Sequence, residues 1–178
     1  VDNLGITDPA VKQNVLYILA NRYFKLNDIY EVRDQKVKYA KAVLTGASKQ
    51  AAIEAAELEK DATLYRCHFE FPASLSLYIN DKQIDAIKDG MTYNSLQVQY
   101  ESLVDMVPSL TEEEKKQIYA WYKEAREFSM DAENSDKKHA AFNKYKGRIN
   151  NYLTKRGYDL VKERNEWYKR LKAAGKKI

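Results

Sequence analysis

The sequence predicts an all-α fold, a helical bundle with two long helices and several shorter ones. Apolar residues recur at spacings of three, four and seven in almost every segment. Residues that favour helix N-caps precede several of these segments, and Gly or Pro separates them. No period of 20 to 50 residues is sustained, which argues against a solenoid. A length of 178 residues is enough for one core, so we expect a single helical domain over 1–178.

The first long helix is expected from Pro9 to about Leu44. Thr7 or Asp8 can cap it, and Pro9 falls in the first turn, where its missing N–H is tolerated. The spacing of its apolar residues is that of an amphipathic helix. These residues are Val11, Val15, Ile18, Leu19, Leu26, Ile29, Tyr30, Val37 and Leu44.

Gly46 and Ser48 interrupt this pattern, and a second long helix follows. It runs through the alanine-rich segment KQAAIEAAELEKDATLYRCHF to about Phe69. Pro72 and the serine-containing stretch after it predict an irregular connector near 70–80.

A third, shorter helix is expected over DKQIDAIKDGM, with Asn80 as its cap and Gly90 at its end. The next segment, TYNSLQVQYESLVDMVP, is ambiguous. SLQVQY alternates like a strand, whereas Val98 to Val107 fits a helix ended by Pro108. We therefore expect an irregular connector near 92–98 and then helix.

Three more helices complete the chain. Thr111 and Glu114 form a capping box before EEEKKQIYAWYKEAREFSM. The following helix begins near Ser135 and stops at Gly157, and Asp159 can cap a last helix to about Ala174. On the first of the three, one face is apolar: Ile118, Trp121, Tyr122, Ala125 and Phe128.

The charge of the chain is unevenly distributed. The formal net charge is +4, but residues 134–178 hold 14 Lys and Arg against 4 Asp and Glu. Residues 1–133 hold 16 against 22. The basic carboxyl third is either a solvated helical surface or a surface that attracts a polyanion. No zinc-finger, RNP or homeodomain signature supports nucleic acid as that polyanion, and a uronic-acid polysaccharide is the other candidate.

Several classes of protein are excluded or disfavoured. The longest apolar run, VLYILA, is too short for a transmembrane segment. The single cysteine, Cys67, rules out an internal disulfide and multi-cysteine metal sites, and a buried inert thiol is expected. Only two histidines are present, and no HExxH, GxGxxG, Walker or GxSxG motif occurs. We expect no metal and no cofactor.

One helix contains an unexpected glycine, Gly147 in KYKGRINNYL. Its core side is formed by Ala141, Phe142, Tyr145, Ile149, Tyr152 and Leu153. Gly147 lies on the opposite, polar side. Either a neighbouring helix or loop approaches closely at Gly147, or this helix is a ligand platform. In the second interpretation Lys144 and Arg148 supply charge, Asn150 and Asn151 supply hydrogen bonds, and Tyr145 and Tyr152 supply flat faces.

A catalytic interpretation depends on few residues. Glycoside hydrolysis needs two carboxylates at a suitable separation. Glu127 and Asp131 lie one helical turn apart and are candidates for this pair, and His139 is a candidate base. Charged residues at this spacing more often form a solvated helix face. An enzyme is possible but not indicated.

Long segments resemble a known family. KDGMTYN, the block DMVPSLTEEEKKQIYAWYKEAREFSMDAENSDKKHAAFNKYKGRINNYL, GYDL, and LGITDPAVKQNV with LNDIYEVRDQK are similar to a domain of unknown function. It occurs in secreted helical proteins of Bacteroidetes encoded near polysaccharide-utilisation genes, some linked to pectin. The resemblance implies a periplasmic or secreted protein whose signal peptide has been removed, and no particular reaction. It centres on positions Lys88, Thr92, Tyr93, Arg126, Glu127, Asp131, His139, Lys146, Arg148, Asn150 and Asn151.

Three functions are therefore weighed. The first is a non-catalytic accessory protein that binds carbohydrate, possibly anionic and pectin-like, with outer-membrane or periplasmic proteins as further partners. The second is a carbohydrate-active enzyme using Glu127 with Asp131, or His139. The third is a periplasmic chaperone-like protein, suggested by the similar helix starts ITDPAVKQNV, INDKQIDAI and LTEEEKKQI, for which shared capping is the simpler explanation. The candidate ligand-binding residues are Lys88, Thr92, Tyr93, Arg126, Glu127, His139, Lys144, Arg148, Asn150, Asn151 and Tyr152.

Overall fold

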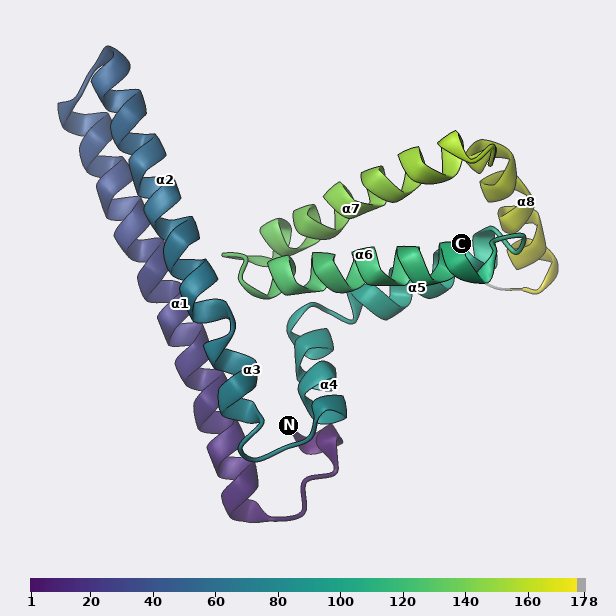
Figure 1. The fold of residues 1–178 in the computed structure, drawn as a ribbon, viewed down its shortest axis with the longest axis horizontal. Helices are drawn as coiled ribbons and strands as arrows, with labels where there is room; N and C mark the ends of the chain where they lie inside the picture. The colour runs from purple at the N-terminus through teal and green to yellow at the C-terminus, as the bar shows by residue number, and fades with distance from the viewer. Residues whose placement is uncertain (176–178) are drawn as a thin grey trace. The chain divides into compact units, whose positions relative to one another are not determined.

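The computed structural model describes residues 1–175, and every regular element in that range is helical (Figure 1). The predicted all-α fold is confirmed. The chain divides into two compact units, Val1–Ile87 and Lys88–Ile178. The expectation of one domain over 1–178 stays a prediction. None of the helices within the described range has both the length and the apolar character needed to cross a membrane.

The first unit is dominated by a helical hairpin. After the short 3-10 helix η1 (Asp2–Leu4), α1 (Pro9–Val43) and α2 (Gly46–His68) run antiparallel side by side (Figure 1). The short helix α3 (Glu70–Leu75) packs against both. Both long helices end within one residue of their predicted ends. Gly46 and Ser48, expected to separate them, lie instead in the first turn of α2, so only Leu44 and Thr45 are outside helix there.

The hairpin is held together by a narrow apolar seam. Val15, Leu26 and Ala40 of α1 are buried, as are Ala56 and Cys67 of α2. Cys67 is therefore the buried thiol that was expected.

One polar side chain is buried in the same seam. Arg22 is 4% exposed, and its Nη1 donates to the Cys67 carbonyl at 3.0 Å while its guanidinium lies over the Phe71 ring. This charge-assisted hydrogen bond ties α1 to the end of α2.

The irregular connector expected near 70–80 is shorter than predicted. Residues 70–75 form α3, because Pro72 lies in the first turn of the helix, where proline is compatible with helical geometry. Phe71 and Leu75 are both buried, and this tertiary burial favours the helix. Only the residues between Leu75 and Asp81 remain irregular.

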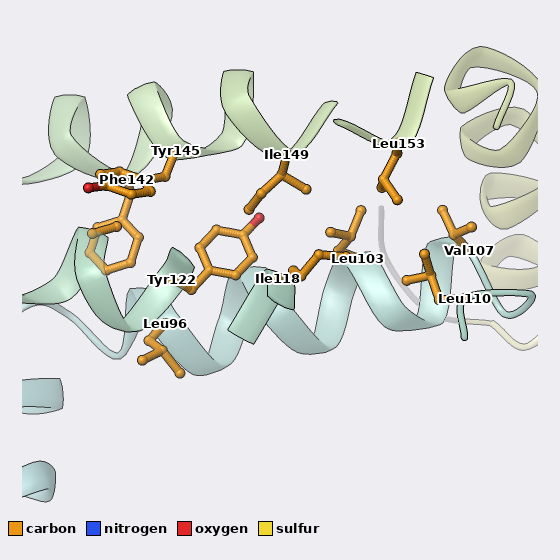
Figure 2. Close-up of a cluster of buried hydrophobic side chains, with 11 residues drawn as sticks. Leu96, Leu103, Val107, Leu110, Ile118, Tyr122, Phe142, Tyr145, Ile149 and Leu153 are labelled. Atoms are coloured by element: carbon orange, nitrogen blue, oxygen red, sulfur yellow. The ribbon is translucent and has the colours of Figure 1, made fainter. Parts of the chain in front are cut away.

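The second unit contains α5 (Ser95–Met106), α6 (Glu112–Met130), α7 (Ser135–Lys155) and α8 (Leu160–Ala173). Helix α4 (Asp81–Met91) leads into it. Figure 2 shows the core of this unit, where side chains of α7 point toward those of α5, α6 and the turn between them. The buried members are Leu96, Leu103, Val107, Leu110, Ile118, Tyr122, Ala125, Phe142, Tyr145, Ile149 and Leu153.

The connector expected near 92–98 is also too long. Only Thr92, Tyr93 and Asn94 lie outside helix, and SLQVQY belongs to α5. Leu96 and Leu103 are buried seven residues apart, so the helical period of the segment prevails over its local alternation.

The three similar helix starts share capping chemistry. Thr111 and Glu114 form the predicted capping box. Asn80 and Gln83 bond each other reciprocally in the same way, at 3.1 and 3.0 Å. Asp8 accepts from the backbone N–H groups of the first turn of α1. The likeness of the three segments is thus explained by capping.

Glu114 also connects the start of α6 to the end of α7. It is 2% exposed and accepts hydrogen bonds from Arg156 Nε at 2.5 Å, Tyr158 Oη at 2.7 Å and the Thr111 N–H at 2.9 Å. Burial acts to raise the pKa of Glu114. The hydrogen bonds from Tyr158, Thr111 and Arg156 outweigh it and lower that pKa to about 2.

We expect Glu114→Gln to lower the free energy of unfolding by about 1–3 kcal/mol near neutral pH, because buried donors lose a charged acceptor. The pKa of Glu114 is lower in the folded protein, about 2, than its ordinary value of 4.5. Its contribution is therefore fully present above about pH 4.5 and is lost as the pH falls toward about 2. Urea denaturation near neutral pH and near pH 3 measures this difference between wild type and variant.

The neighbouring exposed residue Glu113 supplies the control, since Glu113→Gln should change stability little at either pH. A loss in Glu114→Gln that is the same at both pH values would contradict the prediction.

Candidate functional site

Six of the predicted site residues come together in the second unit. They come from three segments: the end of α4 with the turn after it, the last turns of α6, and the first turn of α7. The structure adds two residues that were not predicted, Asp89 and Lys138. We call the group the polar cluster, and its residues are Lys88, Asp89, Thr92, Tyr93, Arg126, Glu127, Lys138 and His139.

Ion pairs join the end of α4 to α6. Lys88 Nζ lies 2.9 and 3.1 Å from the two carboxylate oxygens of Glu127. Arg126 Nη1 donates to Asp89 Oδ1 at 2.8 Å, and its Nη2 lies 3.3 Å from Glu127 Oε1. The Arg126 side chain is only 3% exposed. Burying a guanidinium is costly unless it is paired and hydrogen-bonded, and these two carboxylates meet that requirement.

The turn after α4 is strained. Tyr93 and Asn94 have φ of 59° and 55°, in the left-handed region that non-glycine residues rarely adopt. Thr92 is buried, and its hydroxyl donates to the Lys88 carbonyl at 2.9 Å. The Asn94 N–H donates to the Asp89 carbonyl at 2.8 Å. These bonds hold the turn in place, and the Tyr93 side chain remains 54% exposed.

A buried lysine connects the turn to α7. Lys138 is 7% exposed, and its Nζ donates to the Met91 carbonyl at 2.8 Å. The ammonium lies 5.9 Å from the centre of the Tyr93 ring. Ser129 donates to the Lys138 carbonyl at 3.2 Å, which ties the end of α6 to the same turn of α7.

The protonation equilibrium of Lys138 reflects this environment. Burial lowers the pKa of the Lys138 ammonium, while Tyr93 and the Asp131 carboxylate oppose that effect. Asp131, the second carboxylate of the catalytic hypothesis, therefore acts on the same buried ammonium.

The exposed part of the cluster is a pair of stacked rings. The Tyr93 and His139 rings are 5.3 Å apart between centroids, with an angle of 20° between their planes. Both residues are exposed. Stacked rings cover each other's facing sides, so the exposed parts of the pair are outer ring surface and polar edges next to charged groups, which suit a ligand that has both apolar faces and hydroxyl groups.

The remaining predicted site residues lie further along α7. From Lys138 to Arg148 the helix rises about 15 Å. Four of them form a second surface, distinct from the polar cluster: Lys144, Arg148, Asn151 and Tyr152. The fifth, Asn150, lies about 160° around the helix from Arg148 and belongs to another side of α7.

Two residues of this second surface, Arg148 and Tyr152, contact α6. Arg148 lies 3.3 Å from Glu124 and its guanidinium stacks over Tyr145. Tyr152 is half-buried and meets Trp121 edge to face at 5.0 Å between ring centroids. Lys144 and Asn151 are exposed and Asn150 is half-buried. One face of α7 thus supplies the charges of Lys144 and Arg148 and the amide of Asn151, while Tyr145 and Tyr152 pack toward the protein.

Gly147 has no close neighbour. A β-carbon built at Gly147 would meet no atom of the described residues within 4 Å apart from its own helix. Of the two interpretations of Gly147, the close approach of a neighbouring helix or loop is therefore wrong. The glycine lies exposed on α7 with ordinary helical geometry.

Sequence reasoning missed two members of the cluster. Asp89 lies in KDGMTYN, a segment already noted for its resemblance to the family, so this residue could have been included. Lys138 precedes buried Phe142 by one helical turn and Tyr145 by two, which places a lysine on the core side of α7. A lysine on the apolar side of a predicted helix therefore indicates an ammonium group that is buried and hydrogen-bonded.

Fold and site together define an all-helical protein that carries an ion-paired cluster and an exposed ring pair. The chain belongs to the family described as "Protein of unknown function (DUF3826)", whose model matches residues 1–173. The predicted membership of a domain-of-unknown-function family is thereby confirmed. Comparison with curated proteins gives no match.

We expect Gly147→Ala to stabilise the protein by about 0.5–1 kcal/mol, because the helix interior has room for a methyl group and alanine loses less backbone entropy than glycine. Thermal or urea denaturation measures the change.

Gly157→Ala is the matched control. Gly157 also has open space around it, but its φ is +94°, so alanine there should cost about 1 kcal/mol or more. A loss of stability in Gly147→Ala would show that the position is used by something other than the helix itself.

Proposed function

We propose that the protein binds carbohydrate without catalysis, at the surface formed by Tyr93 and His139. Its role is that of a periplasmic or secreted accessory protein in polysaccharide utilisation. The stacked and exposed ring pair is the observation that carries this proposal. Sugar rings have apolar C–H faces that pack on aromatic side chains and hydroxyl rims that need hydrogen-bonding partners.

The contacts that hold Tyr93 in place favour a binding surface. Lys138 and the bonded turn hold Tyr93 in place before any ligand arrives. A ligand that meets a rigid surface loses less free energy to ordering side chains. Backbone strain maintained by surrounding bonds, as at Tyr93 and Asn94, is common at functional sites.

The charges beside the rings indicate which sugars to test. Lys88 and Arg126 contact Glu127 and Asp89, so two cations stand with two carboxylates. Because these positive and negative charges neutralise one another, we expect an uncharged, hydroxyl-rich ligand at the ring pair itself. Contacts to the carboxylates of a pectin-like chain would come from Lys144 and Arg148, further along α7.

The binding role fits the cluster better than the catalytic alternative does. Glu127 accepts from both Lys88 and Arg126, so its carboxylate serves an ion-pair network. His139 stacks on Tyr93. Glu127 thus has a structural role and His139 contributes a ring to the binding surface, and for that reason we propose binding without turnover.

The biological setting of the proposal comes from the resemblance noted in the sequence. KDGMTYN, Lys88 to Asn94, resembles secreted Bacteroidetes proteins encoded near polysaccharide-utilisation genes. The same segment forms the strained turn and contributes Lys88, Asp89, Thr92 and Tyr93 to the polar cluster. This coincidence supports a role for the cluster in that setting.

An array of pectic and other plant glycans, followed by calorimetric titration, tests the proposal. We expect Tyr93→Asn to weaken binding roughly tenfold, because a stacking face is lost. Asn tolerates the left-handed conformation better than Tyr, so the melting temperature should stay the same or rise.

Tyr17→Asn removes another exposed tyrosine, 60% accessible on α1, and should leave binding unchanged. Absence of binding to every glycan, or equal affinity of wild type and Tyr93→Asn, would contradict the proposal. New reducing ends in the incubated glycans would favour the enzyme instead.

A further inference from the structure

Helix α2 carries a second apolar stripe that faces away from α1. Its residues follow spacings of four, three, four, three and four, the seven-residue pattern of a coiled-coil seam. We call it the outer stripe, and its members are Ala51, Ala55, Leu58, Ala62 and Tyr65 of α2 and Phe69, the residue that caps the carboxyl end of α2. All six are exposed, with Leu58 at 68%, Tyr65 at 71% and Phe69 at 61%.

The outer stripe lies across α2 from the hairpin seam. Ala56 and Cys67 are buried toward α1, and at 3.5 residues per turn the outer stripe points roughly to the opposite side of the helix. Helix α1 therefore does not cover it. A solvated helix face normally carries charges, and the outer stripe carries none over five turns.

We propose that the outer stripe is the interface of a homodimer, in which α2 packs antiparallel against α2 of a second copy. The two-fold axis passes near residue 60. This inference stands on α2 alone and is independent of the carbohydrate proposal.

Side-chain size along the stripe is the first argument for a second copy. The amino-terminal half holds Ala51 and Ala55, and the carboxyl-terminal half holds Tyr65 and Phe69. In the antiparallel register Ala51 meets the partner's Phe69, Ala55 meets the partner's Tyr65, and Leu58 meets the partner's Ala62. Every layer then joins one small and one large side chain, which lets the helix axes approach evenly.

A parallel alignment lacks this complementarity. It would set alanine against alanine at one end of the interface and phenylalanine against phenylalanine at the other. The helices would be forced apart at one end and leave a gap at the other, which is costly in a packed interface. The size gradient therefore favours the antiparallel arrangement of two identical helices.

Polar groups beside the stripe are compatible with this arrangement. Glu54 is placed near the partner's His68, whose ring N–H can donate a hydrogen bond to a carboxylate, and Arg66 is on the opposite border of the stripe at the same end. The acids nearest the axis already have cations of their own chain. Glu59 pairs with Lys36, and Asp61 lies 3.0 Å from Lys60 Nζ. Antiparallel helix dipoles add a small favourable contribution.

The mass of the full chain in solution, measured by sedimentation velocity over a concentration series, tests the proposal. We expect a dimer for the wild type. Leu58→Glu places a charge at two symmetric positions of the interface and should weaken the dimer roughly hundredfold. Leu58 is exposed in the single chain, so the helical circular dichroism should not change.

Tyr17→Glu is the matched control, because Tyr17 is similarly exposed but lies on α1. It should leave the dimer intact. A wild type that stays monomeric at the highest concentration reached, or a Leu58→Glu variant that dimerises like the wild type, would overturn the proposal.

Cross-linking tests the orientation. In a Cys67→Ala background, Asp61→Cys places a thiol beside the partner's equivalent near the axis, and a short bis-maleimide should join the two chains. Ala51→Cys places its two thiols about 27 Å apart in the antiparallel register, beyond the reach of that reagent. Cross-linking of Ala51→Cys but not of Asp61→Cys would show a parallel pair and refute the proposed axis.

Discussion

The ion pairs of Arg126 hold the candidate site together. The guanidinium is almost fully buried and bonds Asp89 at the end of α4 and Glu127 beside it on α6. A buried cation without these carboxylates would be strongly destabilising, so the end of α4 is fixed against α6. The strained turn that presents Tyr93 begins at that fixed point, and Lys138 secures it from α7. The exposed ring of Tyr93 thus depends on two buried cations, Arg126 and Lys138.

The two units of the chain differ in how they bury their apolar side chains. The second unit buries a continuous core among α5, α6 and α7, and its polar groups are tied at the ends of these helices, by Glu114 at one end and by Arg126 and Lys138 at the other. In the first unit, a two-helix hairpin has a narrow seam and leaves apolar side chains exposed along α2. A site for a small ligand therefore fits the second unit, and a protein interface fits the first.

Local chemistry was predictable from the sequence, and long-range pairing was not. The bounds of α1 and the capping box of Thr111 and Glu114 follow from residues within one turn of each other. The start of α5 was mispredicted because SLQVQY alternates locally while burial of Leu96 and Leu103 imposes the helical period. Asp89 and Arg126 are 37 residues apart, and no local pattern specifies their pairing. The environment of Gly147 also depends on tertiary structure, which explains why two interpretations stayed open.

The most direct measurement of the site is the mapping of a bound glycan by NMR, with the best ligand from the array titrated into labelled protein. We expect chemical-shift changes to concentrate at Tyr93, His139 and the backbone of Met91 and Lys138, because these groups form and support the ring pair. Changes confined to Lys144, Arg148 and Asn151 would move the binding surface along α7. A bound glycan that perturbs neither surface would contradict the proposed site.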